Sequence, residues 1–226
     1  MEKLGGVECY IATPTVDYSK DKVVLFLTDA FGLALQNNLL LADDFARNGF
    51  KTIVPDLFNG DPVGESALDP GPGPPFDRER WLSAHGAAQT RPHIDSVMAS
   101  LKTDGVTGFG ATGYCFGARY VVDLAFDGLV RASALSHPSG LEKYAAVCTA
   151  PLLINSCEID RAFPLEAQTQ ADAILGSGKF APGYKREYFE GCTHGFAVRG
   201  DMSDPVVKAG KERAFKASVD WFIKYL

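Results

Sequence analysis

The protein has 226 residues, of which 46% are hydrophobic and 22% are charged, a balance that excludes a disordered chain and suits one globular domain over residues 1–226. Its formal net charge is −6, and it contains no run of lysine and arginine, which argues against nucleic acid and anionic membrane surfaces as partners. No apolar segment approaches the ~20 residues that span a bilayer, and residues 1–10 do not resemble a signal peptide.

The cysteines and histidines indicate a reducing compartment and no metal. The five cysteines follow no regular spacing and form no CxxC pair, so we interpret them as reduced thiols of a cytoplasmic protein. The four histidines are scattered along the sequence, and we therefore expect no metal site and no cofactor.

The first half of the chain alternates predicted strands and helices. Residues 22–28 form a continuous apolar run, which predicts a strand buried on both faces, as in a parallel sheet. We predict a short edge strand at residues 7–12, a helix at residues 37–48 that stops at Gly49, and a further strand at residues 51–54. Residues 59–77, rich in proline and glycine, predict a surface excursion that is either a lid over a pocket or a solvated connection. Residues 80–102 then predict one long kinked helix, with Pro92 as a second start.

The second half continues the alternation. The small and apolar residues 106–111 predict a central strand, and the helix that follows is expected at residues 116–126. Further strands are predicted at residues 132–136, 151–156 and 184–189, and helices are predicted to begin at Pro164 and at Asp204-Pro205. This order predicts an α/β fold with a doubly wound, mostly parallel sheet and helices on both faces.

A G-x-C-x-G pentapeptide, residues 113–117, joins the predicted central strand to its helix. A strand that turns at once into a helix holds the side chain at the turn exposed on a strained backbone, and small neighbours relieve the crowding. The helix N-terminus also favours a negative charge on the sulfur of Cys115. The alternative is a buried cysteine that packs as a small hydrophobe.

Two further polar side chains follow predicted strands, namely Asp160 and His194. Because the carboxyl ends of parallel strands meet at one edge of a sheet, we expect both to converge with Cys115. The chain order of nucleophile, acid and base is that of an α/β-hydrolase triad. In this arrangement the cysteine attacks an acyl carbon, the histidine handles its proton and the aspartate orients the imidazole. Taken alone, Asp160 is also explained as a cap of the helix that begins near Pro164.

The sequence resembles the dienelactone hydrolase family of α/β-hydrolases from residue 22 to the C-terminus. The segments that carry this resemblance are Thr28-Asp29-Ala30-Phe31-Gly32, Pro55-Asp56-Leu57-Phe58, Gly113-Tyr114-Cys115-Phe116-Gly117, His137-Pro138-Ser139-Gly140, Glu158-Ile159-Asp160 with Phe163-Pro164, and His194-Gly195-Phe196-Ala197. The resemblance implies that Cys115, Asp160 and His194 form the triad. It also implies that the backbone N–H groups of Ala30 and Phe116 bind the oxyanion, and that Asp29 contacts the resting thiol, where bacterial members carry a glutamate.

The resemblance also suggests how substrate is bound. Bacterial members hold a substrate carboxylate with arginines, one of them four positions after the histidine. Here that position is Val198 and the arginine is Arg199, with Arg80 as a possible second arginine or, alternatively, part of a solvated helix face. The pocket is expected to be lined by residues that flank the triad in sequence: Phe31, Tyr114, Phe116, Phe163 and Phe196. His137 would either hydrogen-bond substrate or hold its own loop.

The leading hypothesis is therefore a hydrolase that opens a small-molecule lactone or ester through a thioester, as a monomer or homodimer. The residues after His194 resemble the fungal branch of the family, which includes enzymes acting on lactones in secondary metabolism. Two alternatives remain. One is a non-hydrolytic enzyme that uses His194 for isomerisation or dehydration of a polyketide-like ligand, and the other is a non-catalytic binding protein on the same scaffold.

Overall fold

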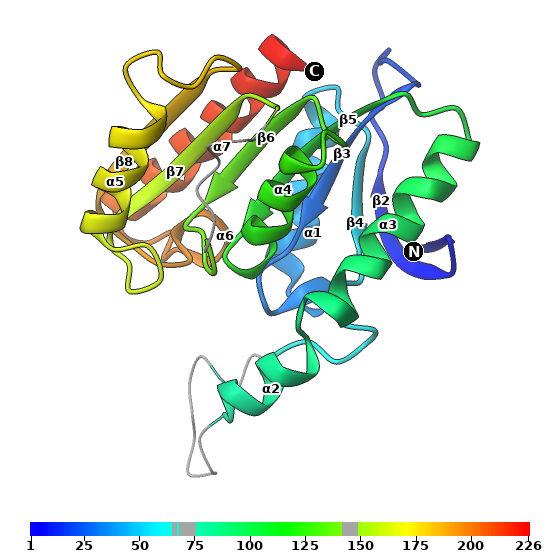
Figure 1. Ribbon diagram of the computed structural model, residues 1–226. Helices are drawn as coiled ribbons and strands as arrows, with labels where there is room; N and C mark the ends of the chain where they lie inside the picture. The colour runs from blue at the N-terminus through cyan, green and yellow to red at the C-terminus, as the bar shows by residue number, and fades with distance from the viewer. Residues whose placement is uncertain (65–66, 68–75, 142–148) are drawn as a thin grey trace.

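The computed structural model describes residues 1–64, 67, 76–141 and 149–226 (Figure 1). Most of the proline-rich part of the predicted 59–77 excursion lies outside the described residues, so its role as lid or connection stays a prediction. Within the described part of the chain, no helix is both long enough and apolar enough to cross a membrane.

The fold is organised around one eight-stranded sheet with the order β1-β2-β4-β3-β5-β6-β7-β8. The strands are β1 (Glu2–Leu4), β2 (Val7–Ala12), β3 (Lys22–Leu27), β4 (Thr52–Pro55), β5 (Gly108–Tyr114), β6 (Ala132–Ser136), β7 (Leu152–Ile159) and β8 (Tyr184–Thr193). From β4 to β8 all neighbours are parallel, while β1 and β2 are antiparallel additions. This confirms the predicted mostly parallel α/β sheet. The expectation that residues 7–12 form the edge strand was wrong, because β1 pairs with β2 and takes the edge.

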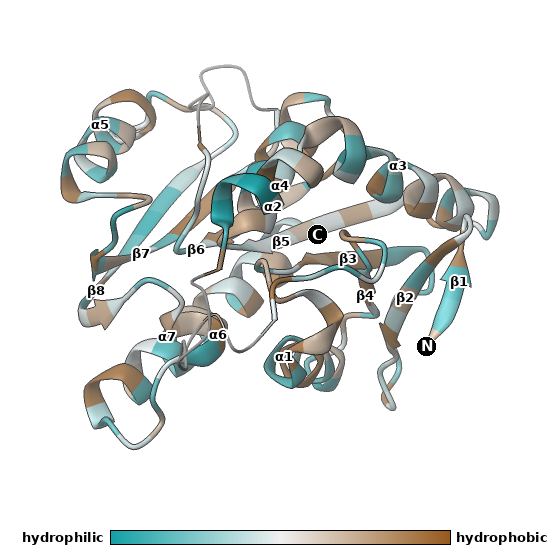
Figure 2. Cartoon of the chain, turned by 90° about the horizontal axis from the view of Figure 1, so that it is seen from below, coloured by the Kyte–Doolittle hydropathy of each residue, from teal (hydrophilic) through white to brown (hydrophobic). Residues whose placement is uncertain are grey.

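Helices cover both faces of the sheet, as predicted. One layer contains α3 (Ala87–Thr103), α4 (Phe116–Phe126) and α5 (Leu165–Leu175), and the other contains α1 (Gln36–Arg47), the short α6 (Phe196–Arg199) and α7 (Pro205–Tyr225), as Figure 2 shows. The close approach of α7 to the sheet depends on Gly110, where a Cβ atom would lie within 3.0 Å of the Phe222 ring. The five residues of β3 that follow Lys22 are apolar and buried, so both helix layers pack on an apolar central strand.

The predicted long helix over residues 80–102 is two helices, α2 (Arg78–Ala84) and α3. The break falls at His85 and Gly86, and Pro92 lies inside α3 rather than starting a helix. His85 Nδ1 hydrogen-bonds the carbonyl oxygen of Trp81 at 2.8 Å, and Gly86 is extended, with φ −69° and ψ 179°. As a result α2 leaves the direction of α3 and projects from the body of the molecule (Figure 1). It lies near the end of the sheet that carries the turn between β5 and α4, residues 113–117, which is called the elbow.

Candidate active site

The turn between β5 and α4 holds Cys115 in a backbone conformation that is rare for a side-chain-bearing residue, with φ 49° and ψ −108°. Both flanking glycines are required by close approach. A Cβ atom on Gly113 would lie 2.7 Å from the Cα atom of Ala118, and one on Gly117 would lie 2.2 Å from the carbonyl oxygen of Leu27. The G-x-C-x-G pattern therefore reflects a helix packed directly against β3 and β5, which leaves the Cys115 side chain half-buried at the carboxyl edge.

His194 and Asp160 meet because they follow the neighbouring strands β8 and β7. Ile159 and Thr193 are register partners, and the His194 N–H donates to the carbonyl oxygen of Ile159 at 3.0 Å. The imidazole Nδ1 lies 2.9 Å from Asp160 Oδ2. The other carboxylate oxygen, Oδ1, accepts the N–H groups of Ala162 at 2.8 Å and Phe163 at 3.1 Å. The carboxylate is thus fixed from two sides, and Nε2 of the imidazole is left for another partner.

Cys115 interacts with the same imidazole. Burial alone would lower the pKa of His194, but hydrogen bonds with Asp160 and Cys115 outweigh it and raise the pKa to about 9. The imidazole is therefore a cation at neutral pH. A cationic imidazole between a carboxylate and a thiol is the arrangement that supports a thiolate nucleophile.

Asp29 forms an ion pair with Arg199, whose side chain is partly exposed. Asp29 is fully buried, and its Oδ1 accepts the Phe31 N–H at 3.2 Å and the Asn38 side-chain amide at 3.0 Å. Arg199 Nε lies 3.6 Å from the other carboxylate oxygen. Burial raises the pKa of Asp29, against the opposing influence of Asn38 and Arg199. The hydrogen bonds of Asp29 thus go to groups other than the thiol, which differs from the contact that the family resemblance implied.

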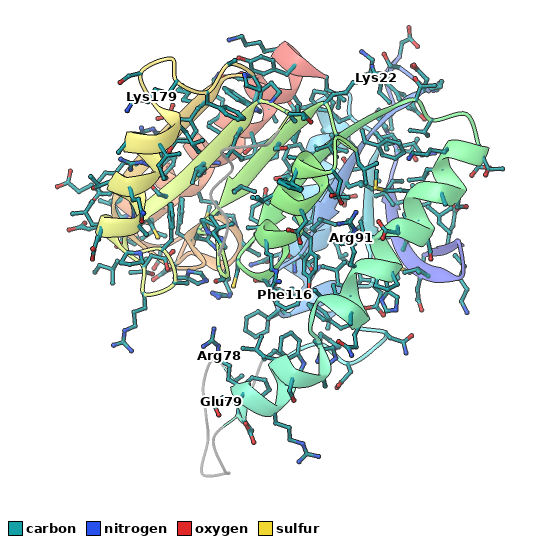
Figure 3. All side chains as sticks on the ribbon, viewed as in Figure 1. Lys22, Arg78, Glu79, Arg91, Phe116 and Lys179 are labelled. Carbon is teal, nitrogen blue, oxygen red and sulfur yellow. The ribbon has the colours of Figure 1, made fainter. Side chains whose placement is uncertain are left out.

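A pocket of about 450 Å³ opens beside Cys115, between α2 and the elbow. Its aromatic walls are Phe31, Phe76, Trp81, His85, Phe116 and Tyr120, and its polar groups include Ser139, Arg78 and Arg119. Ala30 also lines it, so both residues expected to supply oxyanion donors border the space next to the thiol. Their N–H groups donate to no acceptor among the described residues. In Figure 3 the side chains of Arg78 and Phe116 lie between α2 and the body of the molecule.

Several residues expected to bind substrate do not line this pocket, because they pack inside the fold. Tyr114 is 2% exposed and stacks on Phe26 with ring centroids 4.7 Å apart, while Phe163 and Phe196 are each 1% exposed. His137 is also fully buried, edge-on to the His194 ring with centroids 5.0 Å apart. Successive side chains of a strand point to opposite faces of the sheet, so a residue next to the nucleophile in sequence, such as Tyr114, can point into the core.

The two expected arginines are also placed elsewhere. Arg199 folds back over Gly195, where a Cβ atom would lie 2.0 Å from Nη1, and its guanidinium lies 5.1 Å from the centre of the Phe31 ring. Arg80 is exposed and lies outside the pocket lining. The residues of α2 and its C-cap that do line the pocket are spaced as one helix face: Arg78, Trp81, Leu82 and the C-cap His85. Arg80 is two positions from Arg78 and therefore on a different face.

The sequence analysis did not predict Ser139 and Arg119 as pocket residues, although the position of each in the sequence indicates it. Ser139 Oγ lies 3.5 Å from Cys115 Sγ, and it follows β6, the strand next to the nucleophile strand. Arg119 lies four residues after Cys115, one helical turn along the same face of α4. Neither Arg119 nor Arg78 forms an ion pair with any residue that the structure describes.

Comparison with known proteins gives a consistent picture. The family model described as "Dienelactone hydrolase family" matches residues 7–226. Hydrolase pyvD of Aspergillus violaceofuscus is 35% identical over 100% of this chain and 90% of its own length, and Dienlactone hydrolase 1 of Gibberella moniliformis is 32% identical over 97% and 85%. The solved structure of the dienelactone hydrolase-like promiscuous phosphotriesterase P91 from metagenomic libraries has the same fold, with a TM-score of 0.64 at 17% identity over 97% of this chain and 98% of that one.

Proposed function

This chain belongs to the dienelactone hydrolase family and is an ester or lactone hydrolase, and on that premise we propose that it cleaves its substrate through Cys115, His194 and Asp160. The observation that carries the proposal is the chain of contacts at the carboxyl edge of the sheet. Asp160 is 2.9 Å from His194, and His194 interacts with a half-exposed thiol on a strained turn facing a pocket.

In the proposed reaction the Cys115 thiolate attacks the acyl carbon and forms a carbon–sulfur bond. The oxyanion of the tetrahedral intermediate accepts the N–H groups of Ala30 and Phe116, and each such donor is worth roughly 3 kcal/mol in comparable sites. His194 donates its proton to the departing alkoxide, which leaves a neutral imidazole and a thioester. Water then attacks the thioester while His194 takes its proton, and collapse of this second intermediate releases the acid and restores the thiolate. Asp160 stays ionised and holds Nδ1–H throughout.

The pocket supports a small aromatic or conjugated substrate that carries a negative charge. Its volume of about 450 Å³ suits a ligand of one or two rings. Its walls include five aromatic side chains and a histidine. The two arginines without an ion-pair partner among the described residues, Arg78 and Arg119, offer a carboxylate or phenolate a charge-assisted contact. Fungal relatives at 32–35% identity support assigning this substrate to the lactones and esters of fungal metabolism.

Trapping of the acyl-enzyme tests the proposal. We expect an activated aryl ester, quenched in acid during turnover, to leave an acyl group on the peptide that contains Cys115. Cys115→Ala should abolish turnover, and Cys192→Ala, a buried cysteine away from the pocket lining, should keep it. Ring opening of a lactone in ¹⁸O-labelled water should place one labelled oxygen in the product acid. Full turnover by Cys115→Ala, or a product without the label, would exclude the proposed mechanism.

A further inference from the structure

The turn after β6 is bound to the nucleophile by backbone hydrogen bonds on both sides. The Cys115 N–H donates to the carbonyl oxygen of Ser136 at 3.2 Å, and the Ser139 N–H donates to the carbonyl oxygen of Cys115 at 3.0 Å. Between them His137 has a positive φ of 38°, and its ring is buried against His194. This left-handed residue turns the chain back, so that Ser139 lies beside Cys115 instead of continuing away from the sheet.

The side chain of Ser139 consequently lies next to the sulfur of Cys115. Its hydroxyl oxygen is 3.5 Å from Cys115 Sγ, within the distance of a hydrogen bond to sulfur, and both residues line the pocket. Asp29, the residue that the family resemblance implied as the contact of the resting thiol, is instead bound to Phe31, Asn38 and Arg199. The resting sulfur of this chain therefore has a neutral hydroxyl beside it, in addition to the His194 imidazole.

We propose that Ser139 is a catalytic residue whose hydroxyl donates a hydrogen bond to the Cys115 thiolate and thereby stabilises the ionised nucleophile before substrate binds. The inference rests on the proposed function of Cys115. When the thiolate attacks, its electron pair becomes the carbon–sulfur bond and the sulfur loses its negative charge, so the hydrogen bond from Ser139 weakens as the oxyanion gains its own donors. Ser139 keeps its proton throughout and exchanges nothing with the substrate.

Stabilisation of the thiolate by Ser139 should change how the alkylation rate of Cys115 depends on pH, which a purely structural role of Ser139 would not do. A donor that stabilises the thiolate increases its population below the thiol pKa, but it also makes the sulfur a weaker nucleophile. Removal of a donor that lowers the thiol pKa by about one unit should reduce the thiolate population about tenfold in the acid limb. Because the remaining thiolate is about threefold more nucleophilic, the rate of thiol alkylation there should fall about threefold. Above the pKa, where the thiol is fully ionised in either protein, the rate should rise about threefold, because nucleophilicity follows basicity with a coefficient of about 0.4–0.5. The two pH profiles should therefore cross.

Other charged and titratable groups also act on the sulfur, so the experiment changes Ser139 alone. His194 interacts with it from the end of β8, with Asp160 and the neutral His137 behind, and Asp29 and Arg199 lie beyond them. The pocket wall adds the groups from α2 and α4, namely Arg78, His85 and Arg119.

The test compares alkylation of Cys115 by iodoacetamide in wild type, Ser139→Ala and Ser139→Thr across acid to alkaline pH, read by peptide mass spectrometry. Iodoacetamide is small and uncharged, so the measurement needs neither turnover nor substrate binding. Ser139→Ala should show the crossing profile, and Ser139→Thr, which keeps the hydroxyl, should follow wild type. Ser100→Ala on α3, outside the pocket lining, is the control, and thermal melting verifies folding.

An alkylation profile of Ser139→Ala that coincides with wild type would overturn the inference, and so would a loss of equal size at every pH, which is the signature of a displaced thiol. These outcomes leave the proposed function standing if Cys115→Ala is inactive. If Cys115 in wild type reacts no faster in acid than the other thiols, the proposed function and this inference both fail.

Discussion

Replacement of Asp160 by asparagine isolates the carboxylate charge with little change in shape. Asp160 Oδ1 accepts two backbone N–H groups, and the amide oxygen of asparagine can keep both of these bonds. The amide nitrogen would then replace Oδ2, 2.9 Å from His194 Nδ1, and place a donor against a donor. The imidazole is therefore expected to change tautomer, with Nδ1 accepting and Nε2 carrying the proton toward Cys115, where it cannot act as a base.

The magnitude follows from the pKa of His194, which is raised from 6.5 to about 9 against the effect of burial. This rise corresponds to roughly 3 kcal/mol, or a few hundredfold in the equilibrium between imidazolium and imidazole. Asp160 and Cys115 both contribute to this rise in pKa. Loss of the carboxylate charge alone should therefore shift the equilibrium between imidazolium and imidazole by about tenfold to a hundredfold. With the wrong tautomer added, we expect kcat/KM to fall about 10³-fold in Asp160→Asn.

Two measurements check this prediction. NMR titration of ring-labelled histidine should show His194 titrating near pH 9 in wild type and well below that in Asp160→Asn, and turnover of an aryl ester gives kcat/KM. Glu158→Gln is the matched control, since this exposed carboxylate lies two residues earlier and accepts only the Gly191 N–H among the described residues. An unchanged His194 titration in Asp160→Asn together with less than a tenfold loss of kcat/KM would refute the reasoning.

Three further predictions follow from the same geometry. Gly117→Ala places a Cβ atom 2.2 Å from the carbonyl oxygen of Leu27, so we expect a loss of about 3 kcal/mol or more in the free energy of unfolding by urea, and a loss below 1 kcal/mol would contradict the packing described for the elbow. Arg119→Gln should raise KM about tenfold for an aryl ester that carries a carboxylate and leave KM for its neutral analogue unchanged. Equal effects on both esters would show that Arg119 does not recognise the negative charge of the substrate. Because the pKa of His194 is higher in the folded chain than the ordinary 6.5, its stabilising contribution is complete below pH 6.5 and is lost as pH rises through about 9. The free energy of unfolding should therefore fall by up to about 3 kcal/mol over that window in wild type but not in His194→Asn, and a flat wild-type curve would argue against the raised pKa.

The sheet and the convergence of the three triad candidates could both be predicted from the amino-acid sequence. Apolar strands alternating with helices leave few arrangements other than a parallel sheet, and residues that directly follow such strands must lie at one edge. Cys115, Asp160 and His194 come directly after β5, β7 and β8, each of which runs three or four residues beyond its predicted end. The bounds of β6 and α4 agree with the prediction residue for residue, because local patterns of apolar and small residues define both elements.

The walls of the pocket were decided by the tertiary structure alone. Whether Arg78 or Arg80 faces the pocket depends on the direction of α2, which is set by the break at His85 and Gly86. Arg199 is withdrawn from the pocket because a buried carboxylate, far away in sequence, attracts it. Ser139 lies on the sulfur because β6 is adjacent to β5. Periodicity along the chain specifies which face a residue occupies on its own element, but the partner of that face depends on contacts between distant segments, and no local pattern encodes them.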